Sequence, residues 1–295
     1  MPASTPERIL QRIDWQVIRR LDGLLQGDYR SLFYGFGVDF ADLREYLPED
    51  DIRYIDWNVT ARMNTPFVRQ YVEDREITAW FLLDLSPSID FGTKDNIKRA
   101  VLVDFVGVLA RLLTRHGNRV GAMFYGSRVE RTIPARGGRI QVLSLINDLL
   151  KQPSLYRTGL TDLRLFFESA LHAIKRRSLV IILSDFISAP GWERPLSLLA
   201  QRHEVIAVTL SDPWERELPD IGPIILEDSE TGEQIYLDTH DRKFRQRFAE
   251  AGHIRAAELE KTFERHQVDL LPLSTGDDLV YSIVRFAALK KQRRR

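Results

Sequence analysis

The sequence predicts an α/β protein built on a doubly wound, mostly parallel sheet. Apolar runs of strand length alternate with longer segments of helical periodicity along most of the chain. The clearest strand is TAWFLLD at 78–84, which ends abruptly in polar residues and is followed by a long amphipathic segment. SLVIILSD at 178–185 repeats this design. Continuous apolar runs of this kind are typical of strands that helices bury on both faces.

The other elements follow from cap signals and periodicity. Thr5-Pro6 supplies a cap and a proline, which together indicate the start of a helix over 5–26. Further helices are expected at 94–116, 138–151, 161–176, 192–201, 243–265 and 277–289. Strands are expected at 65–72, 119–125, 129–133, 204–210 and 268–273, and a hairpin at 224–236 through Thr231-Gly232.

The segment before the first buried strand has an unusual composition. Glycines and aromatic residues at 27–38 favour an ordered turn or short strand, and residues 42–76 interleave charges with aromatic side chains. Two interpretations stay open: an ordered extension tied to the sheet by arginine–carboxylate pairs, or a partner-binding surface. We therefore expect an N-terminal helix and extension at 1–76, the sheet domain at 77–289 and a basic tail at 290–295.

Bulk composition excludes several classes of function. The 42 basic and 42 acidic residues cancel, so no global field favours nucleic acid, and KKQRRR at 290–295 is expected to be a solvated tail. There are no cysteines, which excludes disulfides, thiolate metal sites and cysteine nucleophiles. Neither a signal peptide nor an apolar window of about 18 residues is found, so we expect a cytoplasmic protein without membrane insertion.

Polar residues follow the two clearest strands at the point where each ends. Asp84, Ser86 and Ser88 come after the first strand, and Asp185 comes after the second. Ligands of open α/β sheets bind at the carboxyl ends of parallel strands, where these side chains are expected. Carboxylates and hydroxyls are hard oxygen donors that suit Mg²⁺ or Mn²⁺. A threonine from the loop 158–161 would add a third hydroxyl.

This pattern, D-x-S-x-S followed by a Thr and an Asp, resembles the metal-ion-dependent adhesion site of the von Willebrand factor type A domain. GLTDLRLFFESAL at 159–171 is similar to that family's opening of a helix, which favours Thr161 and leaves Thr158 in reserve. The resemblance implies a metal site made of Asp84, Ser86, Ser88, Thr161 and Asp185. Two carboxylates and neutral hydroxyls leave a cation incompletely coordinated, so it can recruit an acidic side chain from a partner.

A narrower resemblance covers nearly the whole chain. The stretches at 44–62, 68–76, 82–88 and 212–239 resemble the family named domain of unknown function 58, in which an A-type domain follows an N-terminal extension. The chain departs from that family at Ile89, where a methionine commonly stands, but this side chain is no ligand. The resemblance implies a partnership with a MoxR-type AAA+ ATPase in the assembly or maturation of other proteins.

The resulting prediction is a non-enzymatic, metal-dependent protein-binding module. A metal-dependent phosphohydrolase is the alternative, because Asp84 and Asp185 could also hold a catalytic metal, although the sequence nominates no general base. Neither a G-x-S-x-G elbow nor a phosphate-binding G-x-x-x-x-G-K-[ST] loop is present. A third hypothesis is a structural scaffold whose metal site stays empty.

Overall fold

The computed structural model describes residues 5–24, 43–48, 50–52, 55–63, 65–69, 76–93, 96–156 and 158–293. The chain forms two compact units, of which the larger joins residues 1–32 to 77–295 and the smaller spans 33–76. This division differs from the expected one, because the N-terminal helix belongs with the sheet and the extension alone forms the smaller unit. The expected turn or strand at 27–38 lies outside the described residues.

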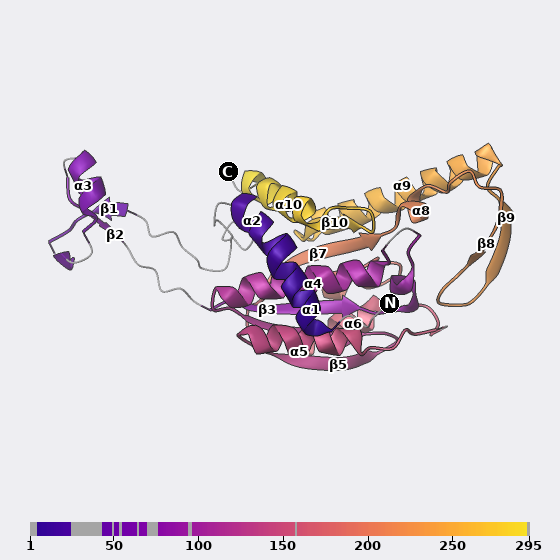
Figure 1. Cartoon of the computed structure of the whole chain (residues 1–295), viewed down its shortest axis with the longest axis horizontal. Helices are drawn as coiled ribbons and strands as arrows, with labels where there is room; N and C mark the ends of the chain where they lie inside the picture. The colour runs from indigo at the N-terminus through magenta and orange to yellow at the C-terminus, as the bar shows by residue number, and fades with distance from the viewer. Residues whose placement is uncertain are drawn as a thin grey trace. The chain divides into compact units, whose positions relative to one another are not determined.

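The larger unit is built on a six-stranded sheet with the order β10-β7-β6-β3-β4-β5 (Figure 1). Its central strands pair in parallel, and β5 alone runs antiparallel, beside β4 at one edge. Along the chain, β4 and β5 are added on one side of β3, and β6, β7 and β10 are added on its other side. This topology confirms the predicted doubly wound, mostly parallel fold of the von Willebrand A or Rossmann-like type. The strands are β3 (Thr78–Asp84), β4 (Arg119–Tyr125), β5 (Val129–Arg136), β6 (Leu179–Ser184), β7 (Glu204–Ser211) and β10 (Asp269–Ser274).

Helices cover both faces of this sheet. The main ones are α4 (Lys98–Arg115), α5 (Arg139–Leu150), α6 (Leu163–Ala173), α7 (Glu193–Arg202), α9 (Arg242–Arg265) and α10 (Leu279–Arg293). On one face, α6, α7 and the end of α9 pack into an apolar cluster that includes Leu82, Phe166, Phe167, Trp192, Leu196 and Phe263. On the other face lie α4 and α5 (Figure 1). None of the helices in the described part of the chain combines the length and apolarity needed to span a membrane.

The N-terminal helix is part of this core. It comprises α1 (Pro6–Arg12), a π-helical turn η1 (Ile13–Ile18) and α2 (Arg19–Leu24), and the Thr5 hydroxyl accepts a hydrogen bond from the Arg8 amide as the cap signal predicts. Ile13 is 1% exposed, and a Cβ placed on Gly107 of α4 would lie 2.6 Å from its Cδ1. The absent side chain of Gly107 therefore lets the two helices approach closely.

The expected basic tail needs correction. Helix α10 continues to Arg293, and Lys290 is only 3% exposed. Its ammonium lies 2.5 Å from Glu204 Oε1 and 3.0 Å from Asp269 Oδ2. The prediction of a solvated segment from 290 onward is therefore wrong for Lys290, because this residue ties α10 to the first residues of β7 and β10.

The smaller unit has its own secondary structure. Strands β1 (Leu43–Glu45) and β2 (Phe67–Arg69) pair antiparallel, and α3 (Trp57–Met63) lies between them in the chain. Asp56 caps α3, because its carboxylate accepts a hydrogen bond from the Val59 amide at 3.3 Å. The described residues of the extension are thus ordered. The strand expected at 65–72 is found at 67–69, and residues 70–75 lie outside the described part.

Candidate metal centre

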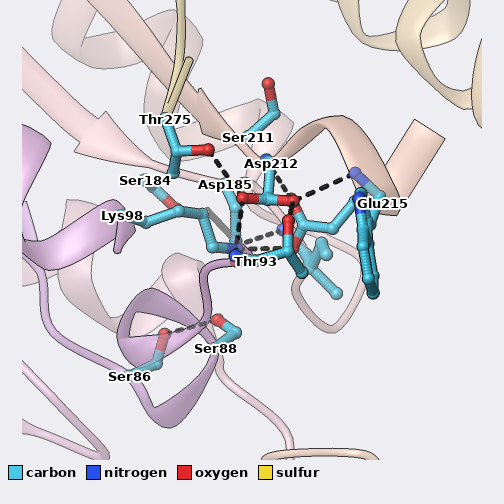
Figure 2. A network of polar contacts seen from close by, with 12 residues as sticks. Ser86, Ser88, Thr93, Lys98, Ser184, Asp185, Ser211, Asp212, Glu215 and Thr275 are labelled. Carbon is cyan, nitrogen blue, oxygen red and sulfur yellow. Dashed lines mark hydrogen bonds and ion pairs between the residues drawn. The ribbon is translucent and has the colours of Figure 1, made fainter. Parts of the chain in front are cut away.

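Four parallel strands end in polar residues at the same edge of the sheet. Because β3 and β6 are direct neighbours, Asp84 at the end of β3 lies beside Ser184 and Asp185 at the end of β6. Ser211 and Thr275 follow at the ends of β7 and β10 (Figure 2). The sequence-predicted residues thus lie where parallel strands of this fold bind ligands.

The D-x-S-x-S motif folds into a compact turn. The Asp84 Oδ1 atom accepts a hydrogen bond from the Ser86 amide at 3.0 Å, which bends the chain as it leaves β3. A short 3₁₀ helix, η4 (Pro87–Asp90), then brings Ser88 Oγ to 3.1 Å from Ser86 Oγ (Figure 2). All three motif side chains are buried. The structure therefore brings the first three predicted ligands together.

Asp84 is a fully buried carboxylate whose negative charge is not balanced by an ion pair among the described residues. Its Oδ2 atom accepts a hydrogen bond from Ser184 Oγ at 2.6 Å. Burial, followed by the negative charge of Asp185, raises the pKa of Asp84 from 3.8 to about 6, and the hydrogen bonds from Ser184 and Ser86 act in the opposite direction. A cation beside Asp84 would relieve both causes.

Asp185 has a partner that the sequence analysis missed. The ammonium of Lys98, at the start of α4, lies 2.9 Å from Asp185 Oδ2 and 2.6 Å from Glu215 Oε1 (Figure 2). Lys98 is fully buried, and the two carboxylates outweigh its desolvation and raise its pKa. The other oxygen of Asp185 accepts a hydrogen bond from the Ile187 amide at 3.0 Å. Asp185 is therefore partly neutralised before any metal binds.

Thr161 is held by a second residue that the sequence analysis missed. Its amide and its Oγ1 atom donate to Glu230 Oε2 and Oε1, both at 2.7 Å. Glu230 is 5% exposed, and its pKa is raised, chiefly by burial, with smaller contributions from Asp185 and Asp228. Thr158, the reserve candidate, hydrogen-bonds instead to the neighbouring Gly159 carbonyl at 3.4 Å. Thr161, rather than Thr158, is therefore the threonine of this loop that contacts a buried carboxylate.

Tyr125 fixes the loop that carries Thr161. Its hydroxyl donates to the Asp162 carbonyl at 2.8 Å, and its ring stacks on Phe166 at a centroid distance of 4.7 Å. Asp162 in turn caps α6 through the Arg164 amide. Burial raises the pKa of Tyr125 to about 12, so this hydroxyl stays a hydrogen-bond donor at neutral pH.

Asp212 organises the neighbouring strand ends. It follows β7, is fully buried, and accepts hydrogen bonds from Thr93 and from Thr275 Oγ1, the latter at 2.6 Å. It also caps the short helix α8 (Pro213–Arg216) in a capping box with Glu215. These hydrogen bonds lower the pKa of Asp212. The D-P-W-E sequence at 212–215 carries this signal, and it positions the Glu215 carboxylate that holds Lys98.

The donor set has the chemistry of a site for a hard divalent cation. Adjacent oxygen ligands of an octahedral Mg²⁺ lie about 2.9 Å apart, which follows from metal–oxygen bonds of about 2.0–2.1 Å. The Ser86–Ser88 distance of 3.1 Å and the Thr161–Glu230 distance of 2.7 Å are both close to this value. Within the described residues, no three acidic or histidine side chains gather as a metal cluster, so any metal must rely on hydroxyl ligands as well.

A family comparison agrees with the narrower resemblance. The profile of the family described as protein of unknown function DUF58 matches residues 42–258. The chain belongs to this family. The match contains all five predicted site residues and also Glu230, so the candidate centre lies inside the region that defines DUF58.

Other sequences and solved structures are similar to this chain over part or most of its length. An uncharacterised protein of Mycobacterium tuberculosis is 35% identical over 283 residues, which cover 96% of this chain and 89% of that protein. An uncharacterised protein of Mycobacterium avium is 36% identical over 163 residues, or 55% of this chain and 94% of that protein. Among solved structures, the conserved hypothetical protein BatB of Bacteroides thetaiotaomicron is similar at a TM-score of 0.45 and 11% identity, covering 73% of this chain and 99% of BatB. An aerotolerance-related membrane protein of Bacteroides fragilis is similar at 0.44 and 15%, covering 74% of this chain and 99% of that chain.

Proposed function

We propose that this DUF58 protein is a metal-dependent protein-binding module and not an enzyme. The observation that carries the proposal is the position of Asp84. This buried carboxylate lies within the electrostatic influence of Asp185, has no ion-pair partner among the described residues, and belongs to the turn that pairs Ser86 with Ser88. A buried charge requires compensation, and a divalent cation supplies it here.

Asp84, Ser86, Ser88 and Thr161 would hold Mg²⁺ or Mn²⁺ directly. Asp185 keeps its bond to Lys98 and balances the charge of the cation from one strand away. The bound metal supplies an electrophilic centre that attracts an acidic side chain. The protein contributes a rigid turn, three neutral hydroxyls and the carboxylate of Asp84. One carboxylate cannot balance the charge of a divalent cation, so the bound metal keeps a positive charge.

The partner that fits this chemistry presents a carboxylate, and we propose a MoxR-type AAA+ ATPase as that partner. A module that recruits such an ATPase would link it to other proteins during their assembly or maturation. Because such an ATPase uses ATP, we propose that the two proteins interact in the cytoplasm. Lys98 supports binding over phosphoester hydrolysis, because two carboxylates and full burial leave its ammonium poorly placed to receive a phosphate.

The test is capture of a purified MoxR-type ATPase from the same organism on immobilised protein. Wild type, Asp84→Ala and the exposed-site control Glu233→Gln are compared in Mg²⁺ and in chelator. We expect capture only with Mg²⁺, by wild type and by Glu233→Gln. Capture that is unaffected by both chelator and Asp84→Ala would refute the metal-bridged mechanism. Hydrolysis of p-nitrophenyl phosphate by wild type that is lost in Asp84→Ala would favour the hydrolase instead.

A further inference from the structure

The hairpin formed by β8 (Pro223–Glu227) and β9 (Gln234–Asp238) buries one of the acidic residues in its turn. Figure 1 shows the two strands as one long, curved arm. Its turn, DSETGE at 228–233, is polar, as expected of a solvated loop, and Asp228 and Glu233 are exposed. Glu230 is 5% exposed. Burying a glutamate costs free energy, so its contacts have to account for its position.

Those contacts join Glu230 to the candidate metal centre. Both carboxylate oxygens accept hydrogen bonds from Thr161, and the Glu230 carbonyl accepts one from the Gly159 amide at 3.3 Å. Asp228 shapes the turn from within, because its Oδ1 atom accepts from the Glu230 and Thr231 amides at 2.9 and 2.8 Å. The turn is thereby ordered in the form that directs Glu230 at Thr161.

The electrostatic surroundings of Glu230 favour the binding of a cation. Glu230 joins no ion pair among the residues that the structure describes, and the negative charge of Asp185 acts on it. Thr161 donates its hydroxyl hydrogen to Glu230 Oε1, which leaves the lone pairs of Thr161 Oγ1 free for a metal. The 2.7 Å between these two oxygens is also close to the separation of neighbouring ligands on one octahedral cation.

We infer, on the basis of the proposed metal site, that Glu230 is this chain's own acidic ligand for the cation. A partner carboxylate then binds by displacing Glu230, and the β8–β9 hairpin withdraws as it does so. The hairpin is suited to this movement, because Ile225, Ile235 and Tyr236 are 62%, 55% and 72% exposed and few of its apolar groups anchor it.

The experiment uses the full chain and Mn²⁺ as the probe. Electron paramagnetic resonance of free Mn²⁺ gives the affinity, and water-proton relaxation gives the hydration of the bound ion. The variants are Glu230→Gln, which keeps the size and removes the charge, and Glu233→Gln, which removes a charge from the same turn at an exposed position. Asp84→Ala serves as the metal-site control. Hydrogen exchange of the hairpin amides at 224–238, with and without Mg²⁺, reports whether the metal holds the hairpin.

We expect Glu230→Gln to weaken Mn²⁺ binding by about tenfold or more and to increase the hydration of the bound ion. Mg²⁺ slows exchange of the hairpin amides in wild type and in Glu233→Gln, and it leaves them unchanged in Glu230→Gln. Equal affinity, hydration and protection in wild type and Glu230→Gln would overturn the inference and leave the proposed function standing. Tighter binding by Glu230→Gln would also overturn it, since Glu230 would then block the site. Absence of Mn²⁺ binding by wild type would overturn both.

Discussion

Asp84 is a buried carboxylate whose ionisation affects the stability of the folded protein. Its pKa is about 6 in the folded protein, against an ordinary value of 3.8. Between these values the folded chain retains a proton that the unfolded chain has released. The stability of the metal-free protein therefore falls as the pH rises from about 4 to about 6. Two pKa units correspond to about 3 kcal/mol.

Asp84→Asn removes this charge and nearly keeps the size of the side chain. In chelator at pH 8, we expect the variant to exceed wild type in free energy of unfolding by about 1–3 kcal/mol, the range allowing for a weakened bond to Ser184. The gain should vanish near pH 4. Urea unfolding at the two pH values measures it. Asp90→Asn is the contrasting control, because Asp90 pairs with Arg99 and its loss should not stabilise. A destabilised Asp84→Asn at pH 8 would contradict the assignment.

The contacts of single residues show which parts of the candidate centre could be predicted from the sequence and which could not. Asp84, Ser86 and Ser88 are close in the chain, so their shared turn could be foreseen. Lys98 contacts an aspartate 87 positions away, and a lysine at the start of a helix is indistinguishable in sequence from a solvated one. Glu230 lies 69 positions from Thr161, in a turn whose composition predicts exposure. Of the residues that were not predicted, Asp212 and Glu215 carried a local signal, the capping box.

At the scale of elements, the antiparallel pairing of β4 with β5 depends on a glycine. The register shifts between Val120 and Ala122, and a Cβ on Gly121 would lie 2.9 Å from both the Ala135 amide nitrogen and the Ile133 carbonyl oxygen. Backbone atoms cannot give way as a flexible side chain can. The β4–β5 pair at this point therefore requires Gly121.

We expect Gly121→Ala to lower the free energy of unfolding by about 1–3 kcal/mol, the range typical of overpacking in a closely packed region. Gly137→Ala is the matched control, because the nearest atom to its added Cβ is 3.6 Å away. Denaturant unfolding of the two variants beside wild type gives the comparison. Similar stabilities for both would show that the sheet edge adjusts to a side chain at 121.

Most elements were predictable because the pattern of apolar residues in each one reflects how the element is buried. β3 and β6 are continuous apolar runs, which is what a strand covered on both faces requires, and both were found at the expected residues. The end of α10 was misjudged, because a run of basic residues indicates solvent, whereas Lys290 meets Glu204 and Asp269 from distant strands. Local composition cannot report such pairings.

At the scale of the whole molecule, the N-terminal helix is an integral layer of the larger unit. Ile13 is buried against α4, so Ile13→Ala should cost about 2–4 kcal/mol of the unfolding free energy of the entire unit. Trp15→Ala, at a side chain that is 65% exposed, should cost less than about 1 kcal/mol. Thermal unfolding, followed by the circular dichroism of the larger unit, measures the loss of stability in both variants. A small effect of Ile13→Ala would mean that the helix docks independently of the fold.

The proposed function requires that this edge of the sheet bind a divalent cation through Asp84 and its neighbours. Calorimetric titration of Mg²⁺ into chelator-treated wild type and Asp84→Ala tests it most directly. We expect wild type to bind one Mg²⁺ saturably and the variant to lose this binding by at least about a hundredfold in affinity. Equal titration curves for the two proteins, whether both bind or neither does, would contradict it.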